Sequence, residues 1–128
     1  MPESIPQKIK EFVEYFSQEK GFKVKDVTTS HSFGDFCVIL SSEDFWISII
    51  SDRSQEFVDL SYDQGHDWLS VGFFKKLLDP NISHANLYLY SFEESICFIK
   101  ENYSAISNLF SDKNITETKR LLNKWFNR

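Results

Sequence analysis

A histidine between two carboxylates is the arrangement in this chain best suited to chemistry. Asp63, His66 and Asp67 fall within five residues, and two carboxylates with an imidazole are ligands that Zn²⁺ accepts. The segment is also typical of a turn that leads into a helix, because Asp and Gly favour turns and negative charge stabilises the first turn of a helix. We favour the turn, with Asp67 in the first turn of that helix, and predict no metal, cofactor or catalytic site.

Catalysis by the other histidines would require residues from separate loops. His31 and His84 lie far from His66 in the sequence, and no nucleophile motif such as G-x-S-x-G accompanies them. The sequence therefore predicts a protein that is not an enzyme. The alternative that stays open is a small ligand-binding or hydrolytic domain that uses His31 or His66 in a pocket between a sheet and helices.

Acidic side chains are concentrated in one third of the chain. Between Asp35 and Asp67 there are eight acids against one base, Arg53, so this segment has a formal charge of −7 and the rest of the chain has +2. Such a segment favours a basic protein partner and disfavours nucleic acid, because affinity for a polyphosphate comes mainly from Lys and Arg. The acids are Asp35, Glu43, Asp44, Asp52, Glu56, Asp59, Asp63 and Asp67.

Aromatic residues accompany these acids, and together they make up the candidate partner-binding set. Because Trp, Tyr and Arg dominate binding hot spots, Trp46, Tyr62 and Arg53 are candidate anchors, although Trp46 is also placed to join the core. For Asp52–Gln55 we favour a hairpin turn of polar residues. The alternative is that a carboxylate of Asp52, Glu56 or Asp59 holds Arg53 and orders the acidic surface. The full set is Glu43, Asp44, Trp46, Asp52, Arg53, Glu56, Asp59, Tyr62, Asp63 and Asp67.

Length and composition indicate one domain without a membrane span. A chain of 128 residues with 41% hydrophobic content is sufficient for a single core. No window approaches the ~20 apolar residues of a transmembrane helix, and the first residues have no apolar signal region. Cys37 and Cys97 lie in apolar neighbourhoods, which predicts reduced core residues in a cytoplasmic protein. Monomer and homodimer both stay open.

The first helix and the strands after it show a change of period. Apolar residues at helical spacing predict an amphipathic helix with a Ser4–Gln7 capping box and a stop at Gly21. From Phe22 the period is two, which predicts strands at about 22–30, 35–41, 44–51 and 55–62. Their short connections predict an antiparallel meander. Both faces of 35–41 are apolar, which predicts a central strand covered on both sides.

Helical spacing returns after Gly65. We expect a helix from Trp68 to Asp79-Pro80, a long helix over 92–110 opened by a Ser91–Glu94 capping box, and a last helix after Asn114. The stretch 81–90 is ambiguous and can form a short extra strand. The predicted fold is α+β, with an N-terminal helix, a four-stranded antiparallel meander and three C-terminal helices packed on the sheet.

The segment from Ile47 to Asp79 resembles small bacterial immunity proteins that accompany polymorphic toxins and contact-dependent growth-inhibition toxins. The matching residues form a turn, a strand and the start of a helix, namely Ser51, Asp52, Arg53, Gln55, Phe57, Val58, Asp59, Leu60 and Trp68. The resemblance implies that residues 1–128 form a single immunity-protein-like α+β domain. It also implies a cytoplasmic, non-enzymatic antidote that binds one cognate toxin, and many such toxins are basic nucleases, which an acidic inhibitor suits.

Overall fold

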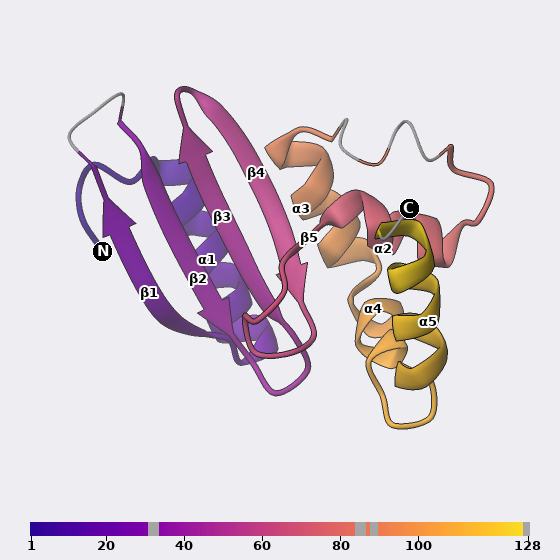
Figure 1. Ribbon diagram of the computed structural model, residues 1–128. Coiled ribbons are helices and arrows are strands. Elements are labelled where there is room, and N and C mark those ends of the chain that lie inside the picture. The colour runs from indigo at the N-terminus through magenta and orange to yellow at the C-terminus, as the bar shows by residue number, and fades with distance from the viewer. Residues whose placement is uncertain (31–33, 84–86, 88–89, 127–128) are drawn as a thin grey trace. The chain divides into compact units, whose positions relative to one another are not determined.

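The computed structural model describes residues 1–30, 34–83, 87 and 90–126, and its fold is α+β (Figure 1). The chain forms two compact units, unit 1 from Met1 to Trp68 and unit 2 from Leu69 to Arg128. Across the described residues, no helix combines the length and the apolar character that crossing a bilayer requires. His31, His84 and the middle of the ambiguous stretch 81–90 lie outside the described residues.

Unit 1 contains one helix followed by four strands. Helix α1 is Gln7–Lys20, and the strands are β1 Lys23–Thr29, β2 Phe36–Ser41, β3 Trp46–Asp52 and β4 Gln55–Ser61. Each strand pairs antiparallel with the next, which confirms the predicted meander. A two-residue strand, β5 (Leu69–Ser70), is fifth in the strand order and is too short for an alternating pattern to reveal.

Helix α1 covers one face of this meander (Figure 1). Its buried side chains are apolar and recur at helical spacing, and the Phe16 ring packs edge-on against Phe22 with centroids 5.5 Å apart. Phe22 in turn packs against Phe45 at the same centroid distance. Aromatic pairs in this geometry stabilise the core beyond the area they bury. The helix is therefore fixed to the sheet at the end where Gly21 turns the chain.

The two ends of α1 compare differently with expectation. Gly21 stops the helix with φ 72°, as predicted, and its left-handed conformation suits glycine. The expected capping box between Ser4 and Gln7 is wrong, because Pro6 is the N-cap and no side chain caps the helix. The residues before it form a separate turn, in which the Ile5 N–H donates to the Pro2 carbonyl at 3.2 Å.

The two faces of the sheet differ in burial. The face toward α1 carries five aliphatic side chains that are completely buried, namely Val38, Leu40, Ile47, Ile49 and Leu60. The opposite face, called the outer face, carries half-buried Cys37, Ile39, Trp46 and Ile50, together with Phe57, which is 46% exposed. Strand β2 is thus fully covered on one face and partly covered on the other, which corrects the prediction of complete cover.

Unit 2 contains four described helices, one more than expected. They are α2 Val71–Leu78, α3 Phe92–Glu101, α4 Tyr103–Leu109 and α5 Ile115–Phe126. The capping box at Ser91 and Glu94 is confirmed, with reciprocal hydrogen bonds of 3.1 and 3.0 Å. The long helix expected over 92–110 is interrupted at Asn102, whose side-chain amide donates to the Phe98 carbonyl at 3.0 Å. The Asn102 backbone N–H donates to the same carbonyl at 3.0 Å, so the side chain adds a second hydrogen bond at the end of α3.

Helix α2 begins later than the sequence pattern indicates. Ser70 is its N-cap, and the Ser70 hydroxyl accepts a hydrogen bond from the Gly72 N–H at 3.5 Å. Trp68 and Asp67 therefore precede the helix, and the predictions that Trp68 opens it and that Asp67 lies in its first turn are wrong. The sequence pattern suggested an earlier start because Trp68 and Leu69 have helical spacing with Val71 and Phe73. Leu69 belongs to β5, and Trp68 lies outside any helix or strand.

The two cysteines differ in environment. Both are free thiols, and Cys37 is half-buried on the outer face of the sheet. Cys97 is exposed on α3, so the prediction that it belongs to the core is wrong. The buried positions of that helix are Phe92, Ser95, Ile96 and Ile99, and Cys97 lies off this stripe.

Candidate partner-binding surface

The meander distributes the predicted acidic residues, apart from Asp59 in the middle of β4, over two opposite ends of unit 1. Because antiparallel strands reverse at every turn, the β2–β3 turn and the segment after β4 share one end, and the β3–β4 hairpin lies at the other (Figure 1). We call residues 42–46 and 61–67 the loop end, and residues 34–36 and 51–56 the hairpin end. The sequence segment that looked like one acidic surface therefore forms two.

At the hairpin end a tight turn fixes one carboxylate. Arg53 and Ser54 have φ values of 52° and 68°, which is the left-handed pair of a type I′ hairpin turn. The Arg53 backbone N–H donates to Asp35 Oδ1 at 2.8 Å. Among the described residues the Arg53 guanidinium forms no ion pair, so the structure agrees with the favoured hairpin turn and not with the alternative in which a carboxylate holds Arg53. Arg53 positions Asp35 through its backbone.

Glu56 does not belong to the outer face. It pairs across β3 with Ser51, and its carboxylate Oε1 lies 2.7 Å from the Lys8 Nζ of α1. Both side chains keep part of their exposure, 42% for Lys8 and 24% for Glu56, so the pair contributes little to stability. Glu56 therefore connects helix and sheet, and we remove it from the candidate partner contacts.

At the loop end a buried hydroxyl organises the chain. Ser61 is 0% exposed, and its Oγ accepts hydrogen bonds from the N–H groups of Gly65 at 2.9 Å and Asp63 at 3.3 Å. The same hydroxyl donates to Asp63 Oδ1 at 2.7 Å, and that oxygen also accepts from the Asp67 N–H at 2.9 Å. Asp63 is therefore a structural residue of the loop. The turn predicted at Asp63–Gly65 is confirmed.

These hydrogen bonds change the titration of Asp63. Partial burial raises the pKa of its carboxyl, but hydrogen bonds from the Asp67 N–H and the Ser61 hydroxyl favour the charged form. The pKa consequently lies below its ordinary value. The pKa of Tyr62 is raised, first by burial and then by the charges of Asp63 and Asp67. The Tyr62 ring thus stays neutral beside carboxylates.

Trp46 lies half-buried beneath this loop. It pairs across the sheet with Ser61, and a Cβ at Gly65 would lie 3.2 Å from the Trp46 ring and 3.4 Å from that of Trp68. The Lys25 Nζ lies 5.8 Å from the Trp46 ring centroid. Trp46 is thus neither a fully exposed anchor nor a core residue, because one side of the ring supports the loop.

An open hollow of about 570 Å³ adjoins Trp46 at the loop end. Its lining combines both signs of charge, with Glu43 and Asp44 from the β2–β3 turn and Lys20 and Lys23 from the two sides of Gly21. Sequence reasoning missed the two lysines because they lie outside the acidic segment. The register supplies the signal, since Lys23 pairs with Ser41 immediately before the acidic turn.

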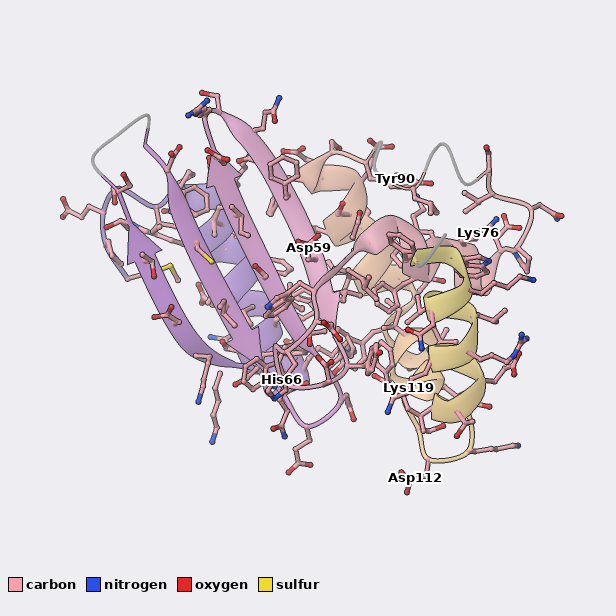
Figure 2. The ribbon with its side chains drawn as sticks, in the orientation of Figure 1. Asp59, His66, Lys76, Tyr90, Asp112 and Lys119 are labelled. Atoms are coloured by element: carbon pink, nitrogen blue, oxygen red, sulfur yellow. The ribbon has the colours of Figure 1, made fainter. Side chains whose placement is uncertain are left out.

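Asp59 and His66 lie apart from the hollow. Figure 2 labels Asp59 on β4 and His66 in the loop that follows it. Asp59 is half-buried on the outer face, and burial raises the pKa of its carboxyl. His66 is exposed and does not line the hollow beside Trp46. Within the described part of the chain, no three His, Cys, Asp or Glu side chains are grouped so that they could hold a metal ion.

The net charges of the two units have opposite signs, as do those of the acidic segment and the rest of the sequence. Unit 1 has 13 acids and 6 bases, a net charge of −7, and unit 2 has 6 acids and 8 bases, a net charge of +2. Lys75 and Lys76 of α2 are engaged with aromatic rings, with Lys75 Nζ 3.8 Å from the Tyr90 centroid and Lys76 Nζ 5.4 Å from that of Trp125. The acidic character of the protein therefore resides in unit 1.

Comparisons with known proteins found no relative: no family model matches this chain, and neither a curated protein nor a solved structure is similar to it.

Proposed function

We propose that this chain is an immunity protein, a non-enzymatic antidote that acts in the cytoplasm and neutralises one cognate bacterial toxin by occluding it. The observation that carries the proposal is the loop end of unit 1. There the exposed acids Glu43, Asp44 and Asp67 lie close in sequence to two half-buried aromatic residues, Trp46 at the start of β3 and Tyr62 in the loop after β4. Acidic side chains around aromatic ones suit the core and rim of a protein interface.

The rigidity of the loop end supports a binding role. Ser61 and Asp63 hold the loop through four hydrogen bonds, and Ser42 holds the neighbouring turn by accepting from the Asp44 and Phe45 N–H groups at 3.2 Å. A surface that is ordered before binding loses less conformational entropy on association. The two loops therefore present their acids in a defined arrangement.

The charge of unit 1 supports a basic partner. A net charge of −7 on a unit of this size attracts a positively charged protein and accelerates its association. The resemblance of the segment from Ile47 to Asp79 to immunity proteins points to the same class of partner. A basic nuclease toxin is the partner that combines both arguments.

The test is co-expression with the C-terminal domain of the protein encoded by the gene immediately upstream, where the proposal places the cognate toxin. We expect that domain alone to stop bacterial growth and this chain to restore it. The variant Glu43→Gln/Asp44→Asn/Asp67→Asn should protect less well, and Glu93→Gln/Glu101→Gln on α3 is a control for the loss of exposed acids in unit 2. Failure of the unaltered chain to restore growth, or equal protection by both variants, would contradict the proposal.

A further inference from the structure

We propose that a groove at the hairpin end receives one lysine or arginine side chain of the partner. The groove has a volume of about 250 Å³ and lies between β1, β2 and β3 of unit 1. The inference rests on the proposed function in one respect, namely that the partner is a basic protein. It adds a second contact at the opposite end of the sheet from the loop end, with a defined chemistry.

The floor of the groove is apolar. The register places Thr28, Cys37, Ile50 and Phe57 in one row across the four strands of the outer face. Cys37 and Ile50 line the groove, and Phe57, at the end of the row, is 46% exposed. A row of this kind offers a surface for the aliphatic stem of a long side chain.

The rim of the groove is acidic and partly fixed. Asp35 and Asp52 line it, and the Arg53 N–H holds Asp35 Oδ1 at 2.8 Å. Of its described lining residues, none is a lysine or arginine, in contrast to the hollow at the loop end, which contains Lys20 and Lys23. An apolar floor with only negative charges at its edge is complementary to a side chain that has an apolar stem and a cationic head group.

The volume selects the kind of occupant. Small-molecule sites commonly occupy about 300–1,000 Å³, and this groove has about 250 Å³. The groove is also open to solvent and does not enclose a ligand, so one side chain from an opposing protein surface fits the space better than a cofactor. Such an inserted cation is typical of an interface hot spot.

Cys37 provides a probe of the groove that needs no partner. We compare the rates at which cationic aminoethyl and anionic sulfonatoethyl methanethiosulfonate modify Cys37, read by peptide mass spectrometry, with exposed Cys97 as the reference in the same chain. Burial raises the pKa of Cys37, as does Asp26 to a smaller extent, against a lowering hydrogen bond to Ser48. Comparing two reagents on one thiol cancels that effect.

We expect Cys37 to favour the cationic reagent about tenfold at low salt, because Asp35 and Asp52, together with Asp26, attract one reagent and repel the other. The preference at Cys97, which lies between Glu93 and Glu101 on α3, should be the same in every variant. The variant Asp35→Asn/Asp52→Asn should reduce the preference at Cys37, with Asp26 supplying the remainder, and the amide oxygen that it places at position 35 can still accept the Arg53 N–H. The matched control Glu43→Gln/Asp44→Asn removes the same charge at the loop end and should preserve it. An unchanged preference in the first variant, or an equal loss in both, would overturn the proposal.

A competition experiment tests the occupant itself. Acetyl-Gly-Arg-Gly-amide at millimolar concentration should slow modification of Cys37 and leave Cys97 unaffected, whereas acetyl-Gly-Gln-Gly-amide should slow neither. Equal effects of the two peptides, or no effect of either, would refute the groove as a cation site. If growth rescue succeeds and the peptides have no effect, only this inference fails. If the peptides compete and rescue fails, the proposed function fails.

Discussion

The two ends of the unit 1 sheet use the same kinds of residue for different purposes. At the hairpin end, Asp35 and Asp52 border an apolar floor. At the loop end, the Asp63 carboxylate accepts hydrogen bonds from within the loop. The hollow there is lined by two lysines as well as by Glu43 and Asp44. The net charge of a sequence segment therefore does not give the charge of a surface. The strand register decides at which end of the sheet each acid lies, and local hydrogen bonds decide whether its carboxylate is available to a partner.

The largest expected effect on stability comes from the buried Ser61 hydroxyl, which holds the loop after β4 at the loop end. Ser61→Ala removes a buried hydroxyl that accepts two N–H groups, and it leaves those groups without their partner. We expect a loss of about 1–3 kcal/mol in the free energy of unfolding, measured by urea denaturation. The control Ser104→Ala changes an exposed residue of α4 and should leave stability nearly unaltered. Equal unfolding free energies for the two variants would show that the Ser61 hydroxyl does not hold the loop.

Two glycines with positive φ sharpen the comparison between the ends. Gly65→Ala at φ 86° meets backbone strain and also the Trp46 ring at 3.2 Å, whereas Gly34→Ala at φ 66° has no atom within 4 Å of its new Cβ. Strain alone costs about 1–2 kcal/mol for an alanine in this conformation. We expect Gly65→Ala to lose more unfolding free energy than Gly34→Ala and to alter Trp fluorescence. The reverse order would contradict the packing of the loop on Trp46.

Two aspartates should show opposite dependence on pH. The folded-state pKa of Asp63 lies below its ordinary value, so its stabilising effect is present above the unfolded pKa and is lost as pH falls through the folded pKa. Asp59 has a raised folded-state pKa, so stability is lost as pH rises from the unfolded pKa through the folded pKa, and the loss is complete above the folded pKa. At pH 7 we expect Asp63→Asn to lower and Asp59→Asn to raise the urea midpoint. Both differences should vanish when pH falls below both pKa values of each residue.

The smallest effect is expected where helix meets sheet. Glu56→Gln weakens the 2.7 Å ion pair with Lys8, and partly exposed pairs of this kind contribute less than about 1 kcal/mol. The difference in unfolding free energy should shrink further in 1 M NaCl because salt screens the pair. A loss well above that bound, or one independent of salt, would indicate that Glu56 has a larger role in docking α1.

Much of the fold was predictable because local patterns determine it. Alternation of apolar and polar residues located the four strands of the meander, and Gly21 and the Ser91–Glu94 pair marked helix ends. The break at Asn102 was not predictable, because the apolar spacing of 92–110 runs through that position unchanged. The start of α2 was not either, because it depends on the Ser70 side chain bonding to the backbone. Apolar spacing alone carries no record of such bonds.

The candidate site was predictable in composition and not in arrangement. The acids and aromatics were visible as residue types, but Ser61 gave no signal, since a buried serine resembles a surface serine until its partners are placed. In the sequence, Glu56 and Asp63 cannot be distinguished from Glu43 and Asp44 as candidate partner contacts. In the structure, Glu56 pairs with Lys8 and Asp63 accepts the Asp67 N–H. Lys23 enters the site through strand pairing with Ser41, and Lys20 enters it from the end of α1, on the other side of Gly21.

The most direct test of the proposed acidic interface is the rate of association with the toxin domain, measured by stopped-flow fluorescence over a range of salt concentrations. We predict that Glu43→Gln/Asp44→Asn/Asp67→Asn will slow association at low salt by about tenfold or more and flatten its salt dependence, because electrostatic steering depends on these charges. Association rates and salt slopes equal to those of the unaltered chain would contradict the account.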